Sequence, residues 1–209
     1  MGKLVKMDIE GFLREVASSS PAPGGGSVAA LAGALSASLS SMVCNLTIGK
    51  EKYKEVEGEM KDILKRSTES ISKLKELIDK DTEAFKEVMD AFKLPKENER
   101  QKEERKQKIQ VALKKATMVP LETARLCFDL IEISKEVVEK GNKNSITDAG
   151  VSAIMAKAGF DSALLNVKIN LSSITDEDFV NKVKEEIDRM EKSMEGKLEE
   201  ILQEVNANL

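Results

Sequence analysis

Apolar side chains recur every three or four positions within a stretch that carries no charge, from residue 16 to residue 49. This spacing places them along a helix and predicts a helix over 28–48. Mostly small residues fill the remaining positions, so neighbouring backbones can approach this helix closely. The bulky positions are Val28, Leu31, Leu35, Leu39, Met42 and Leu46.

The length of this uncharged stretch would suit a membrane span. It holds five serines between residues 27 and 41, however, and lacks the Lys, Arg or aromatic anchors that flank a spanning helix on its upstream side. We therefore expect no membrane partner. We predict instead a helix that is buried on most sides at the centre of the protein.

The same periodicity predicts helices along the rest of the chain, and no segment requires a strand. Pro120 breaks or kinks one helix, because proline lacks the N–H of the helical ladder. The motifs Ser145-x-x-Asp148 and Thr175-x-x-Asp178 open two others. The expected helices cover 7–17, 28–48, 51–93, 98–117, a continuation to 140, 145–169, and 175 almost to the C-terminus.

A single domain over residues 1–209 follows from the length and from the absence of linkers rich in Gly, Ser or Pro. The predicted fold class is all-α. We expect a bundle of long helices around the central, small-residue-rich, buried helix.

Charge and cysteine content indicate which partners and which cellular compartment to expect. The formal net charge of −4 does not suggest a broad basic surface, so we expect no nucleic-acid partner. The start of the chain has no signal-peptide pattern, which favours a cytoplasmic protein. Cys44 and Cys127 lie in apolar helical pattern, without metal-ligand spacing, and are expected to be buried thiols in a reducing compartment.

The chain contains no histidine. This removes the usual general base, the usual zinc ligand and any nucleophile–histidine pair. We therefore predict no metal site. Acid–base chemistry would fall to Asp, Glu, Lys or the single tyrosine, Tyr53.

A run of three glycines, Gly24 to Gly26, precedes the central helix and is followed by Ser27. Glycine is favoured where the backbone must pass very close to another group. Ser27 is a good N-cap, and the amides at a helix start carry partial positive charge. The loop could therefore hold an anionic or carbonyl-rich ligand. The alternative is a tight connector between two helices.

Asp81 interrupts an apolar seam on the helix predicted over 51–93, between Ile78 and Phe85. A carboxylate in such a seam is unfavourable unless it is paired, hydrogen-bonded or protonated. Asp81 is therefore either a polar residue that fixes helix register or a general acid–base group with a raised pKa. Asp79 lies about 200° away around the helix, so it forms no dyad with Asp81 and is expected to be solvated.

Several other polar residues are candidates for ligand contacts. Asn166 and Asn170 form an i, i+4 pair that ends a stripe of small residues, and their amides could bind the donors and acceptors of a heterocycle. The stripe itself fits close helix packing equally well. Lys50 follows the central helix, where a lysine stabilises the helix end or could meet a ligand carboxylate. Asn45 is a similar buried polar candidate, and Asp148 has the position of a helix cap.

At these residues the chain resembles the formiminotetrahydrofolate cyclodeaminase family. The similarity covers nearly the whole chain, and its first and last motifs are the most specific. The matching segments, in order, are Pro21-Ala22-Pro23-Gly24-Gly25-Gly26-Ser27 with Ala29–Ala34, Asn45-Leu46-Thr47 with Gly49-Lys50, Asp79–Phe85, Leu94-Pro95-Lys96, Val119-Pro120-Leu121, Gly141-Asn142, and Asn166–Leu171.

The resemblance implies an all-helical homodimer that binds a tetrahydrofolate derivative, with or without a polyglutamate tail, and needs no other cofactor. It implies a lyase of one-carbon metabolism and histidine degradation, which closes 5-formiminotetrahydrofolate to 5,10-methenyltetrahydrofolate and releases ammonia. The family's catalytic aspartate falls on Asp81. The candidate substrate-binding residues are Pro23, Gly24, Gly25, Gly26, Ser27, Asn45, Lys50, Tyr53, Asp148, Asn166 and Asn170.

Two alternatives to cyclodeamination stay open. Relatives in the same family hydrolyse the methenyl compound, and this chain lacks the formiminotransferase domain to which many cyclodeaminase domains are fused. A non-catalytic helical module that dimerises through its small-residue helices would show the same stripes without any ligand.

Overall fold

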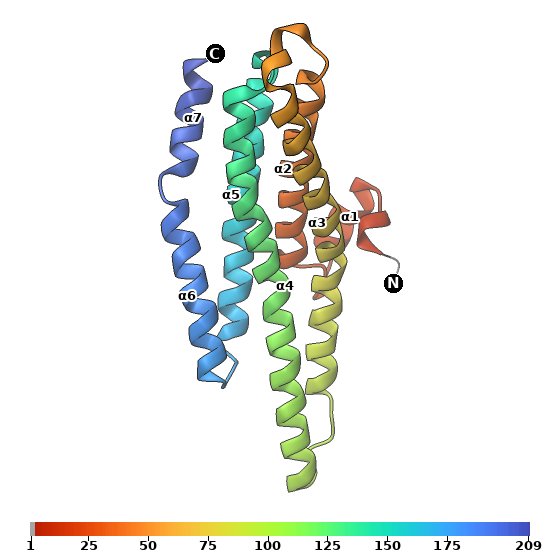
Figure 1. Cartoon of the computed structure of the whole chain (residues 1–209). Helices are drawn as coiled ribbons and strands as arrows, with labels where there is room; N and C mark the ends of the chain where they lie inside the picture. Colours follow the sequence, from red (N-terminus) through yellow and green to blue (C-terminus); the bar gives the residue numbers. More distant parts are fainter. Residues whose placement is uncertain (1–2) are drawn as a thin grey trace.

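The chain forms a bundle of long helices (Figure 1). The computed structural model describes residues 3–209. The prediction that the chain has no signal peptide concerned its first residues, of which Met1 and Gly2 lie outside the described residues. Every regular element within 3–209 is a helix, which confirms the predicted all-α class. The elements are η1 (Leu4–Lys6), α1 (Ile9–Val16), α2 (Gly25–Thr47), η2 (Glu51–Val56), α3 (Glu57–Phe92), α4 (Glu99–Lys140), η3 (Lys143–Ser145), α5 (Ile146–Leu171), α6 (Glu177–Met194) and α7 (Lys197–Ala207).

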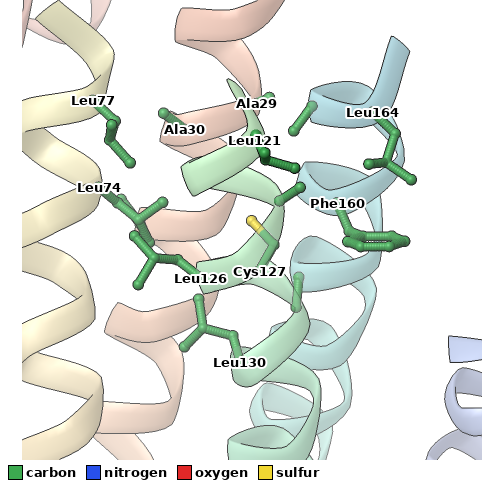
Figure 2. Packing of buried hydrophobic residues seen from close by; sticks show 14 of the residues in the cluster. Ala29, Ala30, Leu74, Leu77, Leu121, Leu126, Cys127, Leu130, Phe160 and Leu164 are labelled. Carbon is green, nitrogen blue, oxygen red and sulfur yellow. The ribbon is translucent and has the colours of Figure 1, made fainter. Parts of the chain in front are cut away.

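Helix α2 is the central helix, since it packs against α3, α4 and α5. Its small residues allow this. A Cβ at Gly33 would lie 2.7 Å from the Sγ of Cys127 on α4, and a Cβ at Gly159 on α5 would lie 2.8 Å from the same atom. Figure 2 shows Cys127 between the helices, among the buried apolar side chains. Burial raises the pKa of this thiol to about 12, as expected for a structural cysteine.

Two of the five serines of α2, Ser36 and Ser40, belong to a buried hydroxyl cluster. Ser152 on α5 lies 2.8 Å from Ser40, 3.1 Å from Ser36 and 2.9 Å from Ser134 on α4, measured between Oγ atoms. Buried hydroxyls need such partners. Helix α2 has the length and hydropathy of a membrane span, but its polar atoms bond within the bundle and most of the helix is buried there.

The structure shows which side of α2 is left uncovered by the bundle. The small face is packed, whereas Val28, Leu35, Met42 and Leu46 are each 37–47% exposed. The reason is geometric, because only the small side chains fit against three neighbouring helices at close range. The bulky stripe is left on the outer surface of α2.

Helix α4 runs without interruption from Glu99 to Lys140, so Pro120 does not break the helix, which was one of the two outcomes predicted for it. Proline cannot donate to the carbonyl four residues earlier, which belongs to Ala116. That carbonyl instead accepts a hydrogen bond from Nδ2 of Asn170 on α5, at 3.0 Å. Tertiary contacts thus replace the missing bond.

Other element ends also differ from their predictions. The N-cap of α2 is Gly24 and not Ser27, since the helix begins three residues earlier than its apolar spacing suggested. The helix predicted over 51–93 begins as the 3₁₀ helix η2, where Tyr53 leaves helical geometry. The last predicted helix is divided at Gly196, whose φ of 76° favours glycine. Asp176, one residue after the predicted Thr175, caps α6 through the N–H of Phe179.

A candidate active-site cleft

The N-terminus of α2 and parts of α3, α4 and α5 enclose a cleft of about 330 Å³. Its floor and walls combine one carboxylate, two carboxamides and the glycine loop with apolar side chains, which is typical of a site for a small polar molecule. The lining residues are Pro21, Ala22, Gly24, Gly25, Gly26, Asp81, Phe85, Val88, Ala116, Asn166, Ile169 and Asn170.

Asp81 is the titratable group of this cleft. Its Oδ2 accepts a hydrogen bond from the backbone N–H of Ser27 at 2.9 Å, and it lies 3.1 Å from the Ser27 hydroxyl. Burial raises the pKa of the Asp81 carboxyl, and the two Ser27 bonds partly oppose that rise. Among the described residues nothing hydrogen-bonds Oδ1. The cleft therefore offers a desolvated carboxyl oxygen to a ligand.

Ser27 acts as a positioning group for Asp81. Its hydroxyl also lies 2.8 Å from the carbonyl oxygen of Ile78 on α3, so its single proton is shared between this carbonyl and Asp81. Ser27 is fully buried. The sequence marked this residue as a helix cap, but its hydroxyl and amide join the start of α2 to α3 and fix the carboxylate.

The glycines of the loop have separate explanations. A Cβ on Gly26 would lie 2.0 Å from Oδ1 of Asp81, and a Cβ on Gly25 would lie 3.1 Å from Nδ2 of Asn166. Two of the three glycines thus make room for site side chains. Gly24 has free space, since the nearest atom to its Cβ position would be the carbonyl oxygen of Pro21 at 3.9 Å. Pro23 is buried, follows a cis peptide bond, and does not line the cleft.

Backbone donors complete this end of the cleft. The N–H of Ser27 is bonded to Asp81, and the N–H of Val28 begins the helical ladder at the carbonyl of Gly24. The amides of Gly25 and Gly26 stand in the first turn, where no helical acceptor exists. Both glycines line the cleft, so a ligand acceptor there would be stabilised by the partial positive charge of the helix start.

Asn166 and Asn170 line the cleft from α5, and they share one helix face, as their spacing predicted. The Nδ2 of Asn166 donates to the Ser162 carbonyl at 2.8 Å, and the Nδ2 of Asn170 donates to the Ala116 carbonyl at 3.0 Å. Each amide thereby keeps a carbonyl oxygen that no other described residue binds. The cleft consequently presents amide acceptors opposite the backbone donors.

The structure does not bring four other candidates to this cleft. Asn45 and Lys50 are exposed at the far end of α2, a helix about 34 Å long. Asp148, in the first turn of α5, lies at that same end and makes no hydrogen bond within residues 3–209. Tyr53 is engaged there, because its hydroxyl donates to Oδ1 of Asn142 at 3.4 Å and accepts the N–H of Lys143 at 3.0 Å.

The apolar and backbone parts of the cleft escaped prediction. Phe85 and Val88 belong to the seam that carried Asp81, so the helical spacing could have assigned them. Ala116 gave no signal, since its contribution is a carbonyl oxygen. Within residues 3–209 no three His, Cys, Asp or Glu side chains come together as a metal site would need.

The fold and cleft define an all-helical protein with a carboxylate-containing cleft of the size and lining typical of small-molecule sites. The model of the family described as formiminotransferase-cyclodeaminase matches residues 8–189, and the chain belongs to this family. This confirms the resemblance drawn from the sequence motifs. The family includes proteins named for cyclodeaminase and for cyclohydrolase activity.

Three similar proteins place the chain within the family. A methenyltetrahydrofolate cyclohydrolase of Methylorubrum extorquens is 48% identical over 180 residues, which cover 86% of both chains. A formimidoyltransferase-cyclodeaminase of Mus musculus is 35% identical over 86% of this chain, which spans only 33% of the mouse protein. A crystal structure of formiminotetrahydrofolate cyclodeaminase from Thermotoga maritima superposes with a TM-score of 0.87 at 35% identity, covering 97% of each chain.

Proposed function

We propose that the chain is a folate-dependent one-carbon enzyme in which Asp81 transfers a proton at the carbon bridging N5 and N10 of tetrahydrofolate. The observation that carries this proposal is the placement of Asp81, a desolvated carboxyl with a free Oδ1 in the cleft. A carboxylate at this point also stabilises the positive charge of a formimino or methenyl group. Family membership supports the folate substrate.

Two reactions use this proton transfer. In hydrolysis, water adds to the methenyl carbon and gives a proton to Asp81. The bond from carbon to N5 then opens as Asp81 returns that proton to N5, and the hydroxyl proton leaves to solvent with formation of the formyl carbonyl. In cyclodeamination, N10 attacks the formimino carbon and loses its proton to Asp81, which returns it to the departing ammonia. Neither reaction transfers electrons, so we propose no cofactor besides the folate.

Hydrolysis of methenyltetrahydrofolate is the reaction we propose first. It is supported by the 48% identity to a cyclohydrolase over 86% of both chains. Cyclodeamination, the reaction expected from the sequence motifs, is the second candidate. Its support is the full-length structural similarity to the Thermotoga protein at 35% identity.

Paired assays on the purified chain decide between them. We expect the absorbance of 5,10-methenyltetrahydrofolate to decay faster with enzyme than without, and we expect little ammonia from the 5-formimino compound. Ammonia release as the faster reaction would reverse the assignment. If neither substrate reacts and reduced folates do not raise the melting temperature, the non-catalytic module is the better account, because a ligand of the folded state must stabilise it.

We also propose a homodimer that pairs α2 with α2 of a second copy in antiparallel orientation. The outer stripe at Val28, Ala32, Leu35, Leu39, Met42 and Leu46 alternates steps of four and three, as a coiled-coil seam does. The order of these steps is the same in both directions, so a two-fold axis maps the stripe onto itself. The outward exposure of its bulky members leaves them available for a partner.

This pairing would bring Lys50, a candidate residue that lies far from the cleft of its own chain, close to the cleft of the second copy. If Val28 faces the partner's Leu46 and Leu35 faces the partner's Leu39, then the partner's Lys50 lies level with Gly24. The far end of one α2 would thereby stand beside the cleft of the other copy. Lys50 would supply a cation for the carboxylate of the folate glutamate tail.

Replacing Leu35 by glutamate is expected to convert the dimer into a monomer, because the charge would be buried near the two-fold axis without a partner. Light scattering coupled to size-exclusion chromatography measures the change. The matched control is Val111→Glu, since Val111 is an exposed apolar residue on α4 away from the stripe. A monomeric wild-type chain, or equal effects of both variants, would contradict the proposed interface.

A further inference from the structure

Pro120 lies inside α4, where proline deprives the helix of one hydrogen bond. The carbonyl left without its helical donor belongs to Ala116, which lines the cleft. That carbonyl accepts a hydrogen bond from Nδ2 of Asn170, at 3.0 Å. The proline and the candidate binding amide are thus joined through one backbone oxygen.

This contact fixes which end of the Asn170 amide faces the ligand. A backbone carbonyl can only accept, so the Ala116 oxygen must be met by the NH₂ group and never by Oδ1. An N–H at position 120 would compete with Nδ2 of Asn170 for the Ala116 carbonyl and draw that carbonyl into the α4 ladder, which weakens the bond to Asn170. The carboxamide of Asn170 would then turn over more readily, because its two ends have nearly the same shape.

Asn166, the other carboxamide of the cleft, makes a hydrogen bond that can be compared with that of Asn170. Its Nδ2 donates to the carbonyl of Ser162, four residues earlier on its own helix, at 2.8 Å. The Ser162 carbonyl is also the helical acceptor of the Asn166 N–H, so a carbonyl within an intact ladder can hold an amide when the bond is local to one helix. Asn170 instead reaches across to another helix, and it does so at the position where a proline has freed an acceptor.

We propose that Pro120 is a positioning residue: by freeing the Ala116 carbonyl it locks the Asn170 amide with Nδ2 toward α4 and Oδ1 as an acceptor for the substrate. The group recognised by this oxygen is a hydrogen-bond donor, such as a ring N–H or an amino group of a heterocycle. The catalytic consequence rests on the proposed folate function, whereas the orientation of the amide does not.

The decisive variant is Pro120→Ala. Restoring the N–H completes the α4 ladder, so the melting temperature is expected to rise. The KM is expected to rise about tenfold with little change in kcat, which corresponds to one hydrogen bond lost in substrate binding. A residue with a purely structural role would give a lower melting temperature or an unchanged KM.

Two controls isolate the mechanism. In an Asn170→Ala background the Pro120→Ala change is expected to leave KM unaltered, because a residue that acts through Asn170 has no effect without it. Additive effects on KM would overturn the proposal. Gly58→Ala controls for helix stabilisation alone, since Gly58 is exposed on α3 and a Cβ there meets nothing within 4 Å. It is expected to leave KM unchanged.

A measurement independent of turnover separates this inference from the proposed function. In the wild-type chain the side-chain NH₂ of Asn170 is expected to exchange slowly with solvent by nuclear magnetic resonance, and Pro120→Ala is expected to speed that exchange at least about tenfold, as an opened hydrogen bond would. A fast-exchanging wild-type amide overturns the role of Pro120. Slow exchange together with inactive folate assays overturns only the proposed function.

Discussion

Replacing Asp81 by asparagine is expected to lower kcat at least about a hundredfold, the usual scale of general acid–base catalysis. An amide has the shape of the carboxyl but cannot carry the proton between nitrogen or water and the leaving group. Its carbonyl oxygen can still accept from the Ser27 amide, which bonds Oδ2 in the native chain at 2.9 Å. The variant should therefore fold and bind reduced folates while losing turnover.

The pH dependence gives this variant a second signature. Because burial raises the pKa of Asp81 above its ordinary value of 3.8, the folded state favours the neutral carboxyl. The free energy of unfolding attributable to this group is therefore highest below the unfolded pKa, and falls as pH rises through the folded pKa. The amide introduced by Asp81→Asn carries no charge, so at pH 7 the variant should melt at the same temperature as the wild type or higher.

Turnover should depend on the same titration of the Asp81 carboxyl, but kcat should rise with pH where the free energy of unfolding falls. The carboxylate accepts the first proton, so kcat is expected to fall on the acid side with a midpoint above 3.8. A pH series of kcat and of melting temperature for both proteins measures the two effects. The residual activity of Asp81→Asn should lack this acid limb.

Asp79 supplies the matched control for Asp81. It lies two residues away on α3, and its Oδ1 accepts the backbone N–H of Leu4 at 2.6 Å rather than facing the cleft. Its bond to the N-terminal segment corrects the expectation of a simply solvated carboxylate. Asp79→Asn is expected to retain turnover. Near-wild-type kcat in Asp81→Asn, or equal losses in both variants, would remove Asp81 from the mechanism.

The sequence predicted the helices well, because helical apolar spacing is a local property that survives packing. It left the outcome open where tertiary contacts decide. At Pro120 the local rule predicts a break or a kink, yet the Asn170 amide satisfies the freed carbonyl and α4 continues. At α2 the sequence separated a bulky face from a small face but did not say which of them is left uncovered, and in the structure Val28, Leu35, Met42 and Leu46 are the exposed ones.

The site was predictable as far as side-chain type allowed. Asp81 was conspicuous because a carboxylate is unfavourable in an apolar seam, and Asn166 and Asn170 because their spacing places them on one face of α5. The backbone contribution of Ala116 and the pairing of Ser27 with Asp81 depend on how helices distant in sequence meet. Helical spacing carries no information about that meeting.

The substitution Gly26→Ala is expected to reduce kcat by a factor similar to Asp81→Asn, about a hundredfold or more. The new Cβ would lie 2.0 Å from Oδ1 and 2.5 Å from Cγ of Asp81, well inside contact distance. The carboxylate must turn away or the start of α2 must separate from α3, and either movement breaks the bonds to Ser27. Steady-state kinetics measures the loss.

Stability and activity should respond differently to this change. Alanine gains about 1 kcal/mol over glycine in a helix, whereas overpacking costs about 1–3 kcal/mol and the lost Ser27 bonds about 1 kcal/mol each, so the free energy of unfolding falls by only a few kcal/mol. The loss of turnover should therefore occur in a folded protein. In the double variant with Asp81→Asn the second substitution should add little, because both remove the same group from its position.

Gly24→Ala is the control that separates a steric effect on Asp81 from a general intolerance of the glycine loop. A Cβ on Gly24 has no neighbour closer than 3.9 Å, and the residue has an extended backbone with φ −128° that alanine adopts readily. Its kcat should stay within about twofold of the wild type, as for substitutions without a disrupted contact. If Gly24→Ala instead loses as much activity as Gly26→Ala, the loop acts through bare backbone contact with the substrate. If neither loses activity, catalysis uses a different position of Oδ1 from the one beside Gly26.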